Sequence, residues 1–163
     1  MRYIHSMATA VAATALSALT PCSSAQGASF AYPQNRATIA AGSNLTVRID
    51  RPTPSAPTVE AAIALGMSSC ETSETGHEHY SCPSPETSFE YLFYAGGFNP
   101  QRPNIVTSGE DFNAFQNFTI EIPESLKGRA ILGFLHSSFG REASGYFPFF
   151  ESVNITVNIV TTV

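Results

Sequence analysis

The sequence contains no tryptophan, and its only lysine is Lys127. Of the 8 Lys and Arg and 13 Asp and Glu residues, only Arg2 precedes residue 26, so the rest of the chain carries a formal charge of about −6. Nucleic acids and anionic membranes bind clustered basic residues, and this composition argues against both partners. No apolar run after residue 25 reaches the roughly 20 residues of a membrane-spanning helix. We therefore expect no membrane insertion.

The first 25 residues have the organisation of a secretory signal peptide. Arg2 and the amino terminus supply positive charge, Ala8–Leu19 is apolar, and Ser23-Ser24-Ala25 offers a small-residue cleavage site after Ala25. The apolar stretch is too short to span a bilayer. We predict a secreted, extracellular protein in which residues 26–163 form a single domain.

Cysteine is scarce, and Cys22 would be removed with the signal peptide. Cys70 and Cys82 then remain, and an oxidising compartment favours a disulfide between them. Closing so short a loop stabilises a fold by about 3 kcal/mol on the chain-entropy model. The alternative is two free thiols that bind a metal ion.

Several segments alternate apolar and polar residues with the period of two that is typical of a half-buried β-strand. The clearest are 44–50, 115–122 and 153–159. The residues predicted to point inward are Leu45, Val47, Ile49, Phe118, Ile120, Ile122, Val153, Ile155 and Val157. About seven such segments, separated by turn residues, predict an all-β fold, an immunoglobulin-like antiparallel β-sandwich.

One segment leaves room for another interpretation. Val59–Met67 alternates but is rich in alanine, so a helix is the main rival to a strand. We predict a strand.

The two closing strands, Ala130–His136 and Val153–Ile159, both alternate, and we expect an aromatic-rich loop between them. Gly128 suits the left-handed end of the turn that precedes the first of these strands.

Three Asn-x-Thr sequons are present, and the sequence places each asparagine on the outward side of its strand. Glycans require outward positions, so the alternation and the sequons agree. The predicted glycosylation sites are Asn44, Asn117 and Asn154.

The histidines offer the strongest hints of chemistry. His77 and His79 would face the same side of an extended chain and could share a Cu or Zn ion, with His136 or a glutamate as a third ligand. We favour a solvated acidic loop instead, and predict no metal and no cofactor.

A catalytic role for His136 would need a serine nucleophile and an oxyanion site, and Ser137 and Ser138 lie beside it. No nucleophile-elbow motif is present, and the adjacent Glu110 and Asp111 would diverge rather than flank a cleft as in glycosidases. We therefore predict a structural role for His136, no catalytic residues and no enzymatic activity.

Aromatic residues cluster in two segments, 91–98 and 146–150. Some must fill the core, and others in loops would suit contact with a protein or a carbohydrate. The residues that we predict to bind a partner are Tyr94, Phe98, Tyr146, Phe147 and Phe149.

Four segments occur in the order found in a known family: Thr58–Gly66, Tyr91–Tyr94, Ile120–Leu126 and Val153–Val157. Together they resemble the necrosis-inducing secreted protein family of fungal effectors. The resemblance implies a secreted fungal protein that acts on plant hosts, affects cell death and suppresses immunity by binding host plant receptor-like kinases. It would also allow action inside the host cell.

The chain departs from the family pattern in two ways. The segment from Cys70 to Cys82 looks like an insertion, and the sequence stops at Val163 where some members continue. The alternative function is a secreted carbohydrate- or cell-wall-binding module that uses the aromatic segment. A metal-dependent enzyme comes third.

Overall fold

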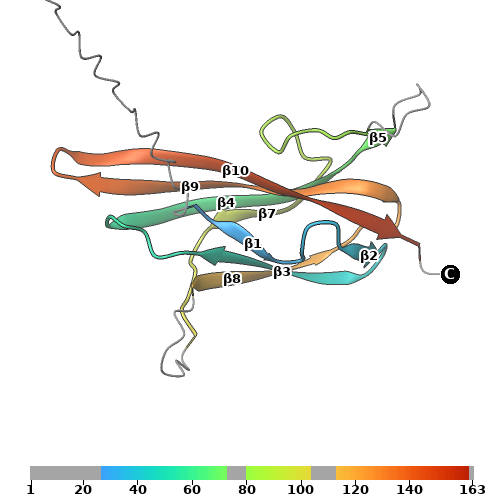
Figure 1. The fold of residues 1–163 in the computed structure, drawn as a ribbon, viewed down its shortest axis with the longest axis horizontal. Coiled ribbons are helices and arrows are strands. Elements are labelled where there is room, and N and C mark those ends of the chain that lie inside the picture. The colour runs from blue at the N-terminus through green and yellow to red at the C-terminus, as the bar shows by residue number, and fades with distance from the viewer. Residues whose placement is uncertain (1–26, 73–79, 104–112, 162–163) are drawn as a thin grey trace, which may run out of the picture.

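The computed structural model describes residues 27–72, 80–103 and 113–161, and the predicted signal peptide lies outside them. Within these residues the chain is all-β, and ten strands form three sheets (Figure 1). Two of the sheets stack as the layers of a sandwich. This confirms the predicted all-β sandwich, with more strands than the seven expected.

The smaller layer has three antiparallel strands in the order β1-β3-β8. These are β1 (Ser29–Tyr32), β3 (Asn44–Arg51) and β8 (Ala114–Glu121). The larger layer has five strands in the order β2-β10-β9-β4-β7. These are β2 (Thr38–Ala40), β10 (Gly145–Val160), β9 (Gly128–Glu142), β4 (Thr58–Ser69) and β7 (Tyr91–Gly97). Because β2 pairs in parallel with the end of β10, this sheet is mixed rather than wholly antiparallel as predicted.

Strands that are distant in the sequence lie side by side in both layers. Here β1, β3 and β8 form one sheet, and β4, β9 and β10 are neighbours in the other. The immunoglobulin-like classification itself stays a prediction.

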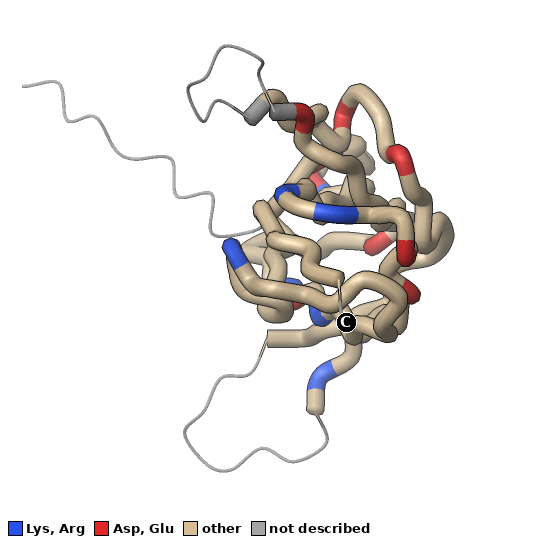
Figure 2. Tube along the Cα trace, turned by 90° about the vertical axis from the view of Figure 1, so that its right-hand side faces the viewer, with Lys and Arg blue, Asp and Glu red and all other residues tan. Residues whose placement is uncertain are grey.

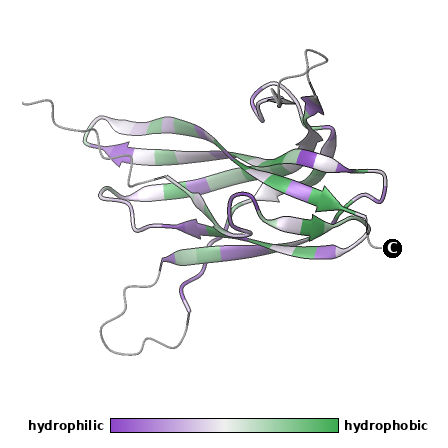
Figure 3. Ribbon diagram, turned by 45° about the vertical axis from the view of Figure 1, so that its right-hand side comes forward, coloured by the Kyte–Doolittle hydropathy of each residue, from purple (hydrophilic) through white to green (hydrophobic). Residues whose placement is uncertain are grey.

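The core lies between the two layers and is built by the alternation seen in the sequence. Figure 3 shows apolar and polar segments following one another along the strands. Seven of the nine residues predicted to point inward are buried, while Val153 and Ile155 are half-buried and pack against the core. The sequon residues Asn44, Asn117 and Asn154 are all exposed.

The alanine-rich segment forms strand β4, as predicted, and not a helix. It pairs with β7 on one side and β9 on the other, and these two ladders outweigh the helical propensity of alanine. A bulge lies between Glu60 and Ala62 in its pairing with β9. One consequence is that residues before the bulge change the face to which they point.

The predicted aromatic-rich loop is wrong, because β9 and β10 continue through it as a long hairpin. The ladder runs to the pair Glu142–Gly145, and residues 143 and 144 form the turn. Aromatic residues favour extended strands, and Gly145 supplies the positive φ of 136° at the turn. Gly128 has a φ of 74°, which confirms the left-handed turn predicted there.

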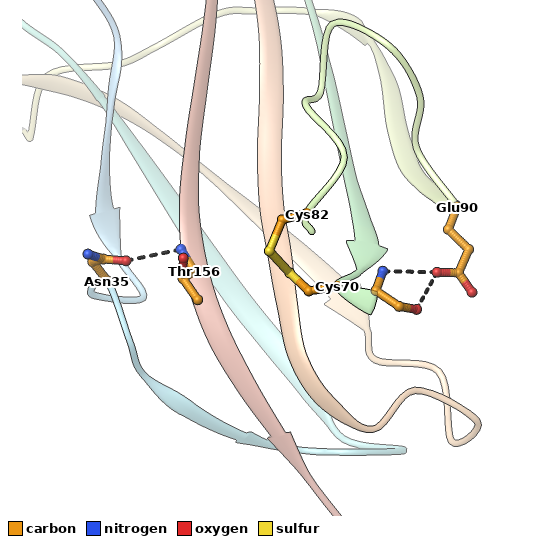
Figure 4. Close-up of a disulfide and its surroundings, with 6 residues drawn as sticks. Asn35, Cys70, Cys82, Glu90 and Thr156 are labelled. Carbon is orange, nitrogen blue, oxygen red and sulfur yellow. Dashed lines mark hydrogen bonds between the residues drawn. A yellow bond between two sulfur atoms is a disulfide. The ribbon is translucent and has the colours of Figure 1, made fainter. Parts of the chain in front are cut away.

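A disulfide joins Cys70 and Cys82, with an S–S distance of 2.07 Å, and this excludes the metal-binding alternative for these thiols (Figure 4). It lies beside the small sheet of β5 (Glu71–Thr72) and β6 (Tyr80–Ser81). Nearby, Glu90 accepts the backbone N–H of Ser69 at 2.9 Å. His77, His79, Glu110 and Asp111, considered above for metal binding or catalysis, lie outside the described residues.

Candidate functional site

One end of the five-stranded sheet carries an exposed apolar surface on its outer side, the side turned away from the three-stranded sheet. Val59 of β4 pairs with Phe139 of β9, which pairs with Pro148 of β10, so the three side chains form a row across the strands. Tyr146 and Phe150 lie two residues to either side of Pro148 and share its face. We call these five residues the aromatic face.

Exposure of this size is unusual for large apolar side chains. The exposed fractions are 53% for Val59, 40% for Phe139, 61% for Tyr146 and 74% for Phe150, and Pro148 is also exposed. Scattered single residues would need no explanation, but contiguous apolar patches mark interaction sites. The aromatic face is therefore a candidate binding surface.

A hollow of about 470 Å³ adjoins the aromatic face at Phe150. Its lining includes Ala62, Ala64, Ser137 and Ser152, which come from three neighbouring strands. Because these side chains are small, the sheet surface is recessed here. The volume falls within the range of small-molecule sites in proteins, about 300–1,000 Å³.

The outer side of the sheet is covered at its other end. A Cβ on Gly133 would lie 2.3 Å from Pro85, and one on Gly66 would lie 2.4 Å from Phe89. Both glycines therefore allow the chain between β6 and β7 to approach the sheet closely. The covered end and the open end divide this side of the sheet, and only the open end carries the aromatic face.

Phe147 and Phe149 point to the opposite, inner side of the hairpin. Phe147 lies against Gly140, where an added Cβ would be 2.2 Å from its ring. Both phenylalanines line a smaller pocket of about 90 Å³ together with Arg51 and Ser138. The predicted aromatic contact region thus consists of two separate surfaces.

The two predicted binding residues of β7 and its following segment do not join either surface. Phe98 is only 3% exposed, so its expected place in an exposed turn is wrong. Tyr94 is half-buried, with its ring 4.9 Å from that of Phe118, and its hydroxyl donates to the carbonyl of Gly97 at 2.9 Å. Both residues are held by the interior of the sandwich.

A cluster of ionisable side chains lies inside the sandwich, beneath the hollow. His136 is 2% exposed, and its two ring nitrogens each contact a carboxylate. Nε2 is 2.6 Å from Oε2 of Glu60, and Nδ1 is 2.6 Å from Oε1 of Glu151. The ring of Phe98 meets the imidazole edge to face, with centroids 5.0 Å apart. We call Arg51, Glu60, His136 and Glu151 the charge cluster.

The charge cluster also links the two layers. Nε of Arg51, at the end of β3, donates to Oε1 of Glu60 at 2.7 Å. Glu151 accepts the backbone N–H of Ala28 at 2.8 Å. A buried charge is costly unless it is paired and hydrogen-bonded, and each carboxylate here has at least two donors.

The environment shifts two pKa values in opposite directions. Burial alone would lower the pKa of His136, but hydrogen bonds and charge from Glu151 and Glu60 outweigh it and raise the pKa above 6.5. Burial alone would raise the pKa of Glu60, but His136 and Arg51 outweigh it and lower the pKa below 4.5. Both shifts favour the ionised pair.

This geometry does not suit His136 as the base of a serine nucleophile. Both ring nitrogens are occupied by carboxylates, so neither is available to Ser137 or Ser138. Within residues 27–72, 80–103 and 113–161, no group of three His, Cys, Asp or Glu residues is arranged to hold a metal ion.

The described charges are few and are spread over several elements (Figure 2). The part of the chain that the structure describes contains no helix of the length and apolarity that a membrane crossing requires.

Sequence reasoning missed the charge cluster, although part of its signal is present. Arg51, His136 and Glu151 each continue the inward alternation of their strands beyond the apolar run. Extending that alternation would have placed them together. Glu60 could not be found this way, because the bulge between Glu60 and Ala62 reverses its face.

Comparison of the chain with models of known protein families and with curated proteins finds no match.

Proposed function

We propose that this protein is a secreted effector that acts by binding a partner protein and not by catalysis. The observation that carries the proposal is the aromatic face, an exposed row of apolar side chains across three strands. The disulfide between Cys70 and Cys82 fits an oxidising, extracellular environment. The resemblance to the necrosis-inducing secreted proteins makes host plant immune-receptor kinases the partners to test first.

The aromatic face is suited to contact through its side chains, because Pro148 interrupts the backbone donors along the adjoining edge of the sheet. Arg141 donates its backbone N–H to Pro57, on the β4 side of β9. Alternate residues of a strand direct their backbone groups to the same side, so the N–H and C=O of Phe139 also face β4. Pro148 pairs with Phe139, and its own backbone groups therefore face away from β9. Proline has no N–H to offer at that edge. A partner would therefore contact the rings, which supply most of the energy in many interfaces.

The test is co-precipitation of the purified protein with plant receptor-kinase domains. Replacing Tyr146 and Phe150 together by serine should weaken binding at least tenfold, because each such anchor contributes about 2 kcal/mol. Leu92→Ser is the matched control, since Leu92 is 60% exposed but lies on β7 at the far edge of the sheet. Unchanged binding by the double variant would refute the proposed surface.

A second candidate function is supported by the hollow beside Phe150. An aromatic ring next to the hydroxyls of Ser137 and Ser152 could hold a sugar, as in a carbohydrate- or cell-wall-binding module. Pull-down on chitin and on glucan separates the two candidates. Retention on either polysaccharide, lost in Phe150→Ser, would favour this second function.

A further inference from the structure

The charge cluster joins three adjacent strands directly beneath the hollow. His136 of β9 pairs with Glu151 of β10 on one side, and on the other side Glu60 of β4 pairs with Ser138, two residues from His136. Neighbouring residues in a strand point to opposite faces. The residues next to the cluster, including Ser137, Phe150 and Ser152, therefore line the hollow or belong to the aromatic face.

The two contacts of His136 need two donated protons. An ionised carboxylate only accepts hydrogen bonds, and an imidazole donates from both nitrogens only when it is protonated. A neutral ring would turn a lone pair toward either Glu60 or Glu151 at a separation of 2.6 Å. One of the two strand-to-strand contacts would then be lost.

Loss of the proton would also unbalance the charges of the cluster. The charged groups that face His136 are Glu60 from β4, Glu151 from β10 and, through Glu60, Arg51 from β3. With His136 protonated, two positive groups balance two negative ones. Without the proton an excess negative charge remains inside the sandwich, where water solvates the two largely buried carboxylates only in part.

We propose that the charge cluster is a protonation-dependent latch, which ties the side chains of β4, β9 and β10 together beneath the hollow and the aromatic face and loosens this part of the sheet when His136 becomes neutral. The consequence of this latch for partner binding rests on the proposed function, but the latch itself does not.

The direction of the pH dependence follows from the raised pKa of His136. Stabilisation by the latch is fully present below the ordinary value of 6.5 and is lost as the pH rises through the raised value. The hollow is therefore well ordered at mildly acidic pH, where Glu60 is ionised and His136 is protonated, and it loosens at alkaline pH.

The experiment compares wild-type protein with Glu151→Gln over a pH series, using NMR of histidine ring protons and backbone amides. The glutamine oxygen can still accept from His136 and Ala28, but the negative charge that raises the pKa is gone. Glu142→Gln is the matched control, since Glu142 is exposed at the hairpin turn. Glu60→Gln serves as a second variant should the first not fold.

In the wild type we expect His136 to titrate above 6.5, and the amides of Ala62, Ser137 and Ser152 to shift at the same midpoint. Glu151→Gln should move both transitions to lower pH, and Glu142→Gln should leave them in place. Titration of His136 at or below 6.5, or amides that do not follow it, would overturn the latch. The test uses no partner, so a failure of the proposed function would leave this result standing.

Discussion

Arg51 and Glu60 form an ion pair across the interior of the sandwich, joining the end of β3 in one sheet to β4 in the other, with Nε 2.7 Å from Oε1. The side chain of Arg51 is 5% exposed. Most contacts between the layers are apolar, and this one fixes their relative position by charge. Glu60 also contacts His136, so the stability of the fold and the ionisation of His136 are coupled at this end of the sandwich.

Removing the positive charge of Arg51 should therefore destabilise the fold. Arg51→Met leaves the apolar stem and takes away the charge, and we expect the free energy of unfolding to fall by about 3 kcal/mol, the lower end for a broken buried pair. Arg48→Met is the control, because the Arg48–Asp50 pair is more exposed and should contribute about 1 kcal/mol or less. Urea unfolding of both variants measures the difference, and equal losses would refute the role given to Arg51.

Acid should weaken the fold through Glu60. Its pKa is lowered, so its contribution is present above the ordinary value of 4.5 and is lost as the pH falls through the lowered one. Glu60→Gln should reduce the loss of stability between neutral and strongly acidic pH. Some slope should persist, because a hydrogen bond from Ser69 lowers the pKa of Glu90 as well.

Glu121→Gln provides the comparison for this acid series. Glu121 is an exposed carboxylate at the end of β8, opposite Asn44. Unfolding free energies measured at several pH values should separate the two variants. A slope that is equally unchanged in both would mean that Glu60 does not govern acid unfolding.

The disulfide should stabilise the end of the sheet opposite the aromatic face. Replacing Cys70 and Cys82 together by serine should lower the free energy of unfolding by about 3 kcal/mol, as expected for a closed loop of this length. Mass spectrometry of the non-reduced protein first checks that the bond is present. A double variant as stable as the wild type would show that packing alone holds this segment.

The fold was predictable where each strand has one buried side. Along β3 and β8 a single-residue shift would turn every apolar side chain to solvent, so the alternation fixes both register and burial. The part of the β9–β10 hairpin nearest its turn, which includes residues 145–150 of β10, was not predictable. Its exposed aromatic residues break the alternation of apolar and polar side chains. There the cross-strand ladder, and not burial, keeps the chain extended.

The candidate site was predictable only in part. Tyr146, Phe147 and Phe149 were expected to be accessible, and they are exposed. Tyr146 lies on one side of the hairpin, and Phe147 and Phe149 lie on the other. This separation arises because residues 145–150 form part of strand β10, whereas the sequence predicted a loop there. The charge cluster depends on the bulge in β4, a two-residue irregularity that leaves no clear mark in the sequence.

Pro148 should protect the open edge of β10 from pairing with another chain. The backbone N–H of Arg36 donates to the carbonyl of Thr156, and the backbone N–H of Asn158 donates to the carbonyl of Ala37. The backbone groups of the even-numbered residues of β10 therefore face away from β9. Among the described residues, β2 pairs with this edge only from Asn158 onward. The edge from Tyr146 to Asn154 is therefore unpaired there, and Pro148 removes one donor from its middle.

Restoring that donor should promote association. Pro148→Thr supplies an N–H and a side chain that favours strands, so the edge becomes a continuous template for a second copy of the chain. We expect a shift to dimers or larger species in size-exclusion chromatography as concentration rises. Pro54→Thr, in the connection between β3 and β4, is the control and should stay like the wild type. A Pro148→Thr protein with unchanged elution at all concentrations would show that the aromatic face or nearby residues, and not this proline, prevent strand pairing.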